Sequence, residues 1–413
     1  MVGAGEQYLA PFAVFLKANN LQIGFISAIP PIFGAIFQLL SVKFLYFLKS
    51  RKKIVLWSVR GQAMTWPFIL SIPFFMDRHA LPVFIVAVTV YFALGSFAHP
   101  SWRSMMGDFV DADRRGGYFG FRSRWMSLMT FSAFCLAGFI LHHAEQNAIT
   151  IFGFSVIFAL AFLARLISAA VISKITEPEF ASHSKDYFSF LQFIRKGRGS
   201  NFGQFVVYTA LIHFSVNLSG PFITPYLLRD LQFSYLKFMV CSSAVVLAQY
   251  LTLRFWGRCA DYFGNKKMLH ITGMMLAIIP CLWVFTQNFI SIVGIQLFAG
   301  VAWGGFALSM ENFIYDAVSP QKRPQCVAIF TCCNAIGILC GSLGGGMLSQ
   351  HLPSVFTIGT IHLSLVSNLY PIFILSALLR LMVTFYRMPH IQEERSVHPL
   401  TLRGVWKIIR FKK

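Results

Sequence analysis

Glu6 and Glu311 are the two acidic residues that fall within the long apolar segments of this chain. Glu6 lies ten residues before Leu16, where its apolar segment ends, so in a helix its carboxylate is roughly 15 Å from that end. A carboxyl group removed from water there favours its protonated form and can exchange a proton when access to solvent changes. Glu6 is therefore a candidate proton carrier. A structural carboxylate held by Gln7 or by a cation is the alternative.

Polar partners for Glu6 are expected from a second copy of its surroundings, 210 residues later in the chain. This shift places Gln7 on Asn217, and His213 lies one helical turn before Asn217 on the same helix face. We therefore expect the two amides to lie at one depth, with His213 as the nearest titratable group of the second copy. Glu6 itself maps onto Val216, so it has no polar counterpart.

The composition places these residues in a membrane protein. Of the 413 residues, 56% are hydrophobic and only 12% are charged, which is far too apolar for a soluble globule. The net charge of +20 arises from Lys and Arg that cluster in short alternate loops, where 27 of the 35 lie, as they do in cytoplasmic loops. The charge therefore indicates orientation, with a lipid bilayer and not a nucleic acid as partner.

Twelve apolar runs are long enough to cross a bilayer, which takes about 20 residues. They begin near residues 2, 22, 54, 81, 125, 149, 203, 235, 268, 289, 325 and 367. An even number of spans places both termini on one side, and the basic tail makes that side cytoplasmic. The sequence thus predicts a multi-pass protein of the cell (inner) membrane.

Short landmarks repeat along the chain at shifts of 208, 210 and 214 residues, which indicates two halves that arose by duplication. The repeated landmarks are Pro11-Phe12 with Leu21-Gln22 and Pro221-Phe222 with Leu231-Gln232, Asp108 with Arg115 and Asp316 with Arg323, and Lys52-Lys53 and Lys266-Lys267.

These halves predict the domain organisation of the chain. We expect a first six-helix bundle, a cytoplasmic linker, a second six-helix bundle and a basic cytoplasmic tail, over residues 1–172, 173–202, 203–386 and 387–413. Pro221 has about eighteen residues of span before it, whereas Pro11 has ten. The first span is therefore short, and we expect its true start to lie upstream.

The segment from Gly257 to Lys267 reads Gly-Arg-Cys-Ala-Asp-Tyr-Phe-Gly-Asn-Lys-Lys between two apolar runs. Gly257 lacks a side chain where helices come close, and Gly264 can adopt the positive φ of a sharp reversal. Asp261 is costly at the hydrocarbon edge unless it meets a partner such as the positive end of a helix. The spacing of these residues resembles the loop signature of the major facilitator superfamily of secondary transporters, and departs from it at Tyr262, where the family usually carries a cation.

That resemblance implies an all-α membrane protein with twelve transmembrane helices in two pseudo-symmetric six-helix bundles. In the family this loop helps to hold the cytoplasmic side closed, and the resemblance carries that role to Gly257, Asp261, Gly264, Lys266 and Lys267. An ordinary charged turn is the alternative. The resemblance also implies latching roles for residues that flank the loops after spans 4 and 10, namely Asp108, Arg115, Asp316 and Arg323.

Spans 1, 4, 7 and 10 line the central cavity in the family, which makes other polar groups there candidates. Gln296 and Trp303 in span 10 are such candidates, although a polar residue between helices more often serves packing. Arg103 and Glu311 lie at equivalent positions of spans 4 and 10. They could pair when the cytoplasmic mouth is shut, or Glu311 could meet a nearer cation.

Other patterns are expected to be structural. The eight Cys residues lie in or beside apolar spans, so we expect no disulfide, and no Cys or His spacing resembles a metal site. Gly337 and Gly341 in span 11 are expected to allow close helix packing. Aromatic and basic residues in Tyr187–Lys196 and after Leu402 predict segments that lie in the membrane interface.

We therefore predict a secondary active transporter, a monomer that moves a small organic solute by alternating access with coupling to protons and without a cofactor. The chain has no Gly-x-x-x-x-Gly-Lys loop, so ATP does not drive it directly. It shows no cluster of acids, His or metal ligands at one membrane face, so an enzyme is not expected. A transporter-like receptor or an uncoupled facilitator is the alternative.

Overall fold

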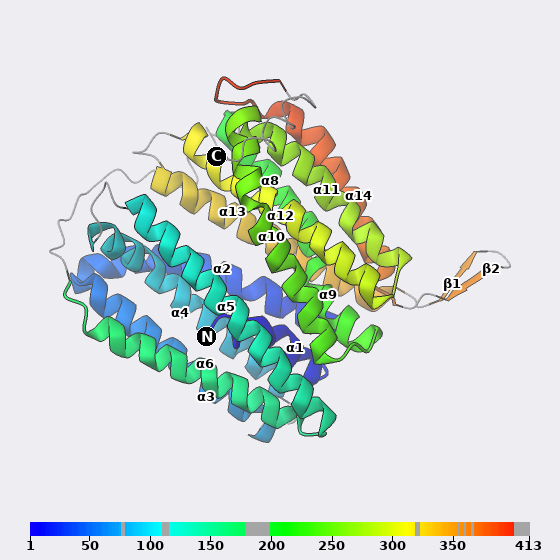
Figure 1. Cartoon of the computed structure of the whole chain (residues 1–413), viewed down its shortest axis with the longest axis horizontal. Helices are drawn as coiled ribbons and strands as arrows, with labels where there is room; N and C mark the ends of the chain where they lie inside the picture. The colour runs from blue at the N-terminus through cyan, green and yellow to red at the C-terminus, as the bar shows by residue number, and fades with distance from the viewer. Residues whose placement is uncertain are drawn as a thin grey trace. The chain divides into compact units, whose positions relative to one another are not determined.

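The computed structural model describes residues 1–75, 79–109, 115–177, 199–318, 323–352, 355–358, 361–364 and 367–399, and nearly all of them are helical. The first half of the chain forms η1 (Glu6–Tyr8), α1 (Leu9–Phe15), α2 (Asn20–Leu48), α3 (Arg51–Phe75), α4 (Ala80–Phe109), α5 (Arg115–Gln146) and α6 (Thr150–Ser173) (Figure 1). The second half forms α8 (Asn201–Asn217), η3 (Gly220–Phe222), α9 (Ile223–Pro225), η4 (Tyr226–Asp230), α10 (Tyr235–Phe263), α11 (Asn265–Phe285), α12 (Phe289–Ala317), α13 (Arg323–His351), α14 (Tyr370–Arg387) and η5 (Met388–His390).

Each of the twelve predicted spans corresponds to a helix or to a broken helix. Ten helical segments among the described residues are long and apolar enough to cross a membrane, with Asn201–Asp230 counted as one. The other two are η1 with α1, which together reach only from Glu6 to Phe15, and α3, whose first ten residues include four cations. The short first span is thus present as a short helix.

A small β-hairpin is the departure from an all-helical chain within the described residues. β1 (Val355–Ile358) pairs with β2 (Ile361–Ser364) in antiparallel register, with Val355 opposite Ser364 (Figure 1). It lies between α13 and α14, in a connection between two spans, and therefore leaves the helical architecture unchanged.

The chain divides into two compact units. Unit 1 comprises Met1–Lys185 together with Phe222–Met239, and unit 2 comprises Asp186–Pro221 together with Val240–Lys413. Within unit 1, α2 and α3 pack on α4, and α6 packs on α3 and α5. Within unit 2, α8 packs on α13, and α11 packs on α12 and α14.

The segment Phe222–Met239 belongs to unit 1 through specific contacts. The Arg229 guanidinium donates a hydrogen bond to the Asn20 side-chain oxygen at 3.0 Å. The backbone N–H of Tyr235 donates to the Glu145 carboxylate at 3.2 Å, and the Tyr235 ring lies 5.7 Å from the ring of Phe154. These contacts attach a segment that follows α8 in the sequence to helices of the first half.

Glycines in α13 let it approach α8 closely. A Cβ atom at Gly337 would overlap the backbone carbonyl of Ala210, and one at Gly341 would overlap the carbonyl of Phe214. The prediction that these two glycines serve close helix packing is confirmed.

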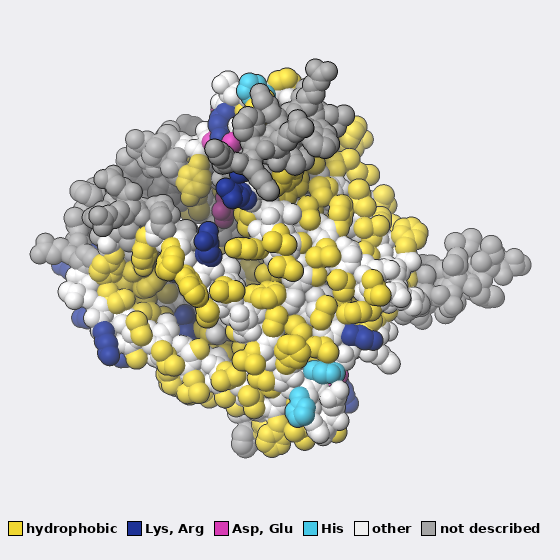
Figure 2. Space-filling view, in the orientation of Figure 1, with side chains coloured by type: hydrophobic (Ala, Val, Ile, Leu, Met, Phe, Trp, Pro, Cys, Tyr) yellow, Lys and Arg dark blue, Asp and Glu magenta, His cyan; other side chains and the backbone are white. Residues whose placement is uncertain are grey.

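The described surface is dominated by hydrophobic side chains, and Lys, Arg, Asp and Glu are sparse on the face shown in Figure 2. Large side chains such as Phe47 and Phe285 are more than 80% exposed, which suits helices that face lipid. The predicted interfacial segments Tyr187–Lys196 and the tail after Leu402 lie outside the described residues.

Candidate functional site

Glu6 is held against α3, α4 and α6 within unit 1. A Cβ atom at the preceding Gly5 would meet the Trp66 ring at 2.5 Å and the Ala161 methyl at 2.9 Å, so this glycine lets η1 approach α3 and α6. The Tyr91 hydroxyl of α4 donates a hydrogen bond of 2.7 Å to the Glu6 carboxylate. The ring of Trp66 packs edge-on to Tyr91 with centroids 5.0 Å apart, so the donor is fixed in place.

A second polar layer surrounds this carboxylate. Gln62 of α3 is 3% exposed, and its side-chain N–H donates to the Tyr91 backbone carbonyl at 2.9 Å. The Gln62 oxygen accepts a hydrogen bond from the Arg165 guanidinium of α6. Arg165 interacts electrostatically with both Tyr91 and Glu6. The result is a network of a carboxylate, a phenol, an amide and a cation, a composition that can exchange a proton and respond to the change in charge.

The second half contains a counterpart of Arg165 that sequence reasoning did not pair with it. Arg380 of α14 lies 215 residues after Arg165 and is 4% exposed. Its guanidinium donates to the backbone carbonyls of Leu276 and Val216 at 2.9 and 3.3 Å, and to the Ser219 hydroxyl at 3.0 Å. The sequence signal was available, because both arginines stand within the sixth apolar segment of their half.

The other predicted residues of the proton pathway are less engaged. Gln7 is exposed, next to Glu6 in η1. The Asn217 amide donates to the backbone carbonyl of His213 at 2.8 Å, within its own helix. Gln296 is 7% exposed in α12, and Trp303 packs against Phe306 with ring centroids 5.9 Å apart. The roles assigned to these residues remain predictions.

The two glycines of the loop motif differ in what they do. Gly264 separates α10 from α11 with φ +93° and ψ 156°, so the predicted positive φ is confirmed. Gly257 lies inside α10, two turns before the helix ends. A Cβ atom there would come no closer than 3.8 Å to another side chain, that of Leu308. The prediction that Gly257 permits a close helix approach is therefore wrong, because the helix continues past it with open space beside it.

The charged residues of the motif meet the tail segment Ile391–His398, which sequence reasoning did not connect with them. Arg395 forms ion pairs with Asp316 at 2.9 Å and, more loosely, with Asp261 at 3.9 Å. The Asp261 side chain is 77% exposed. The N-terminus of α11 is instead met by Glu393, whose carboxylate accepts from the Lys266 backbone N–H at 2.8 Å.

Further contacts hold the same tail segment. Lys267 donates its ammonium to the backbone carbonyl of His398 at 2.8 Å. The His398 ring stacks on Tyr262 with centroids 4.4 Å apart, and its backbone N–H donates to the Tyr262 carbonyl at 3.1 Å. The Asn265 amide donates to Asp316 at 2.6 Å. At the position where the family usually carries a cation, this chain thus uses Tyr262 as a stacking surface.

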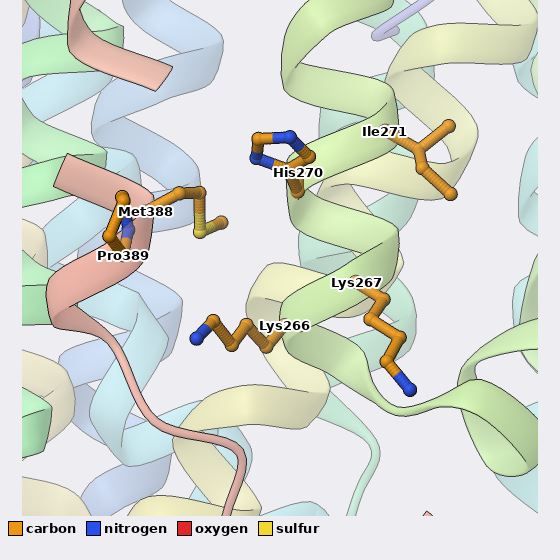
Figure 3. A pocket seen from close by; sticks show the side chains of 6 residues that line it. All are labelled: Lys266, Lys267, His270, Ile271, Met388 and Pro389. Atoms are coloured by element: carbon orange, nitrogen blue, oxygen red, sulfur yellow. The ribbon is translucent and has the colours of Figure 1, made fainter. Parts of the chain in front are cut away.

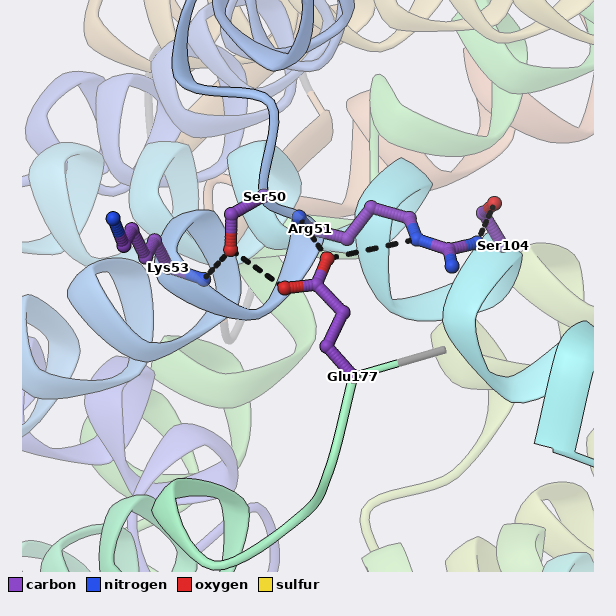
Figure 4. A network of polar contacts seen from close by, with 5 residues as sticks. All are labelled: Ser50, Arg51, Lys53, Ser104 and Glu177. Carbon is purple, nitrogen blue, oxygen red and sulfur yellow. Dashed lines mark hydrogen bonds and ion pairs between the residues drawn. The ribbon is translucent and has the colours of Figure 1, made fainter. Parts of the chain in front are cut away.

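The first half has an equivalent of the Glu393 contact (Figure 4). Glu177, which follows α6, accepts hydrogen bonds from the Arg51 backbone N–H and the Ser50 hydroxyl, each at 2.6 Å. The Arg51 side chain is almost fully buried, lies 3.8 Å from the same carboxylate and donates to Ser104 at 3.0 Å. Glu177 and Glu393 are 216 residues apart, so a carboxylate after the sixth helix caps the third helix in both halves.

The remaining predicted residues are not brought into contacts. Arg103 in unit 1 and Glu311 in unit 2 both have exposed side chains, and their pairing remains a prediction. The side chains of three predicted latch residues lie outside the described part of the structure, namely Asp108, Arg115 and Arg323.

A pocket of about 310 Å³ lies between the start of α11 and η5. Figure 3 shows Lys266 and His270 extending from α11 toward Met388 and Pro389, whereas Lys267 points away from them. No predicted residue of the proton pathway lines this pocket. It therefore belongs to the neighbourhood of the loop motif and not to that of Glu6.

Two halves that repeat the same contacts, built from helices able to cross a membrane, define a multi-pass membrane transporter of duplicated design. The sequence pattern of the Major Facilitator Superfamily matches residues 205–413, and the chain belongs to this family. The earlier resemblance in the loop is thereby confirmed.

Relatives by sequence match only parts of the chain. Multidrug resistance protein MdtG of Salmonella choleraesuis is 31% identical over 97 residues, which are 24% of each chain. Protein ZINC INDUCED FACILITATOR 1 of Arabidopsis thaliana is 26% identical over 132 residues, 31% of this chain and 26% of that protein. The chain therefore spans about a quarter of the length of these curated relatives.

Solved structures match over nearly the whole length. The nucleoside transporter NupG superposes with a TM-score of 0.70 at 14% identity, covering 94% of this chain and 95% of that one. A D-xylose-proton symporter gives a TM-score of 0.70 at 13% identity, covering 96% and 94%. At these identities the likeness establishes the major facilitator fold alone.

Proposed function

We propose that this protein is a secondary active transporter that moves a small organic solute by alternating access, with proton coupling at Glu6. Family membership supports transport, and the relatives named above are described as acting on drugs, nucleosides or xylose, all small solutes. The proposal places the protein in the cell (inner) membrane with both termini in the cytoplasm, as its Lys and Arg distribution predicts.

The hydrogen bond from Tyr91 to Glu6 carries the proposal of proton coupling. An ionised Glu6 accepts this bond at 2.7 Å and is attracted to the Arg165 cation. Protonation removes the charge on Glu6, so both interactions weaken. Because Glu6 lies in η1, directly before α1, its charge controls how firmly the first span is held against α4 and α6.

The moving bodies in this proposal are the two six-helix bundles predicted from the sequence, residues 1–172 and 203–386. They are joined by the linker over residues 173–202, and the basic tail over residues 387–413 follows the second bundle. Phe222–Met239, which packs within unit 1, would exchange contacts such as that between Arg229 and Asn20 during the cycle.

Uptake into proteoliposomes with and without an imposed pH gradient tests this function. A panel of nucleosides, sugars and amphipathic cations is offered to the wild type, to Glu6→Gln and to Glu394→Gln. The last variant makes the same chemical change at an exposed carboxylate outside the spans, so it controls for the loss of one negative charge.

We expect the gradient to drive accumulation of one solute class by the wild type and by Glu394→Gln, and Glu6→Gln to equilibrate the solute without accumulation. Accumulation by Glu6→Gln equal to that of the wild type would refute coupling at Glu6. Flux that ignores the gradient in the wild type would identify an uncoupled facilitator, and binding without flux a receptor.

A further inference from the structure

The two buried arginines Arg165 and Arg380 occupy equivalent places in the two units. Each lies in the sixth helix of its half, and each lies one helical turn after a residue that touches the first span of that half. In unit 1 the residue is Ala161, against which Gly5 packs. In unit 2 it is Ser376, whose hydroxyl donates to the backbone carbonyl of Ser215 at 2.5 Å. Gly5 and Ser215 are themselves 210 residues apart, so the arrangement is duplicated.

In unit 2 the arginine fixes a break in the first span with groups that do not titrate near neutral pH. α8 ends at Asn217, and Arg380 donates to the Val216 carbonyl and the Ser219 hydroxyl at that end. A cation at a helix C-terminus is stabilised by the unpaired carbonyls there. The Ser219 hydroxyl also donates to Ser376 at 2.9 Å. This copy therefore holds its helix end independently of pH.

In unit 1 the equivalent arginine acts on a group that can gain and lose a proton. The shift of 210 residues that relates the two first spans places Glu6 at the position of Val216. Where Arg380 meets a peptide carbonyl of that residue, Arg165 interacts electrostatically with the Glu6 carboxylate. Gln62 of α3 anchors the Arg165 guanidinium, much as the Leu276 carbonyl of α11 anchors Arg380.

Other groups that act on this pair are few among the described residues. The Tyr91 phenol of α4 bonds Glu6 directly, and the amino group of Met1 interacts electrostatically with both Glu6 and Arg165. His99, also of α4, interacts electrostatically with Arg165. Arg165 is the permanent cation of this set.

We propose that Arg165 is the positioning residue that sets the pH at which Glu6 exchanges its proton, and that Arg380 is its duplicated counterpart without this role. The duplication has thus produced one copy of the arginine contact that responds to protons and one that does not. This inference rests on the proposed function only in taking Glu6 as the proton site.

Infrared titration of the purified full-length protein tests the inference without any transport. The signal is the carboxylic acid C=O band that is absent from Glu6→Gln, followed against pH. The variants are Arg165→Gln, Arg165→Met, Arg165→Lys, Arg380→Gln and Ser219→Ala. Neutralising a cation inside the membrane removes a desolvation cost, so the Arg165 variants are expected to fold. Ser219→Ala perturbs the second copy mildly and serves if Arg380→Gln does not fold.

We expect the midpoint of this band to move upward by about one pH unit or more in Arg165→Gln and Arg165→Met, because loss of a nearby cation disfavours the carboxylate. Arg165→Lys keeps the charge and should restore the wild-type midpoint. Arg380→Gln and Ser219→Ala should leave it in place. An unmoved midpoint in the neutral Arg165 variants, or an equal shift in the unit 2 variants, would overturn the inference.

Transport measured alongside separates this inference from the proposed function. If the band shifts as expected but wild-type uptake ignores pH, then the coupling proposal fails and the role of Arg165 stands. If uptake depends on pH through Glu6 but the band midpoint ignores Arg165, then coupling stands and the role of Arg165 fails.

Discussion

Replacing Gly264 by alanine should destabilise unit 2 strongly. The residue has φ +93° and ψ 156°, a region that is essentially confined to glycine, and another residue there costs about 1–3 kcal/mol. The added Cβ would also overlap the Glu393 carboxylate. Glu393 must then release the Lys266 N–H, a hydrogen bond to a charged group worth about 1.5–3 kcal/mol. The two effects together amount to roughly 3–5 kcal/mol.

Gly257→Ala provides the matched control from the same motif. Gly257 lies inside α10, and its added methyl group meets Leu308 at an ordinary contact distance of 3.8 Å. Alanine is favoured over glycine within a helix by about 0.5–1 kcal/mol. This variant is therefore expected to be as stable as the wild type or slightly more stable.

Unfolding in mixed micelles titrated with SDS, followed by tryptophan fluorescence, gives both free energies of unfolding. The double variant Gly264→Ala with Glu393→Ala removes the overlap and isolates the backbone cost. Equal stability of Gly264→Ala and wild type would contradict the reasoning, as would a loss in Gly257→Ala comparable to that in Gly264→Ala.

Two other substitutions should separate structural contacts from surface chemistry. Glu177→Ala leaves Arg51 buried without its carboxylate and should cost about 3 kcal/mol in the same unfolding measurement, whereas Glu394→Ala, at an exposed site, should cost less than about 1 kcal/mol; equal losses would show that the Glu177 contact does not form. Gly341→Ala forces a methyl group against a backbone carbonyl of α8 and should cost about 1–3 kcal/mol, whereas Gly294→Ala, whose Cβ meets nothing within 4 Å, should be tolerated.

The helices could be predicted because a membrane span needs a long apolar run and little else. Even α3, with Arg51 and Arg60 in its first ten residues, was predicted, since its run continues far enough beyond them. Gly264 was predictable for a similarly local reason, because a reversal over one residue between two helices requires a conformation that glycine readily adopts.

The polar contacts of the site could be predicted only in part. Glu6 stood out because acids are rare in apolar segments, but Tyr91 is one of 13 tyrosines and carries no local mark of its partner. Arg380 bonds mainly to backbone carbonyls, which every residue possesses. The spacing that links it to Arg165 was present in the sequence, yet its meaning depends on contacts that only folding reveals.

Gly257 shows the opposite error. The motif that resembles the family loop suggested a glycine needed for close approach, but whether a neighbouring helix comes near depends on packing that a single sequence does not determine. The space beside Gly257 is open, whereas glycines outside the motif, such as Gly337, lie against a backbone.

The assignment of Phe222–Met239 to unit 1 has a consequence for synthesis of the protein. The ribosome makes Met1–Lys185 first, and then a stretch of unit 2, before it reaches the piece that completes the first unit. A nascent chain halted before residue 222 therefore leaves Asn20, Glu145 and Phe154 without the contacts made by Arg229 and Tyr235. Insertion into the membrane can proceed helix by helix, but neither half reaches its final packing until both are nearly made.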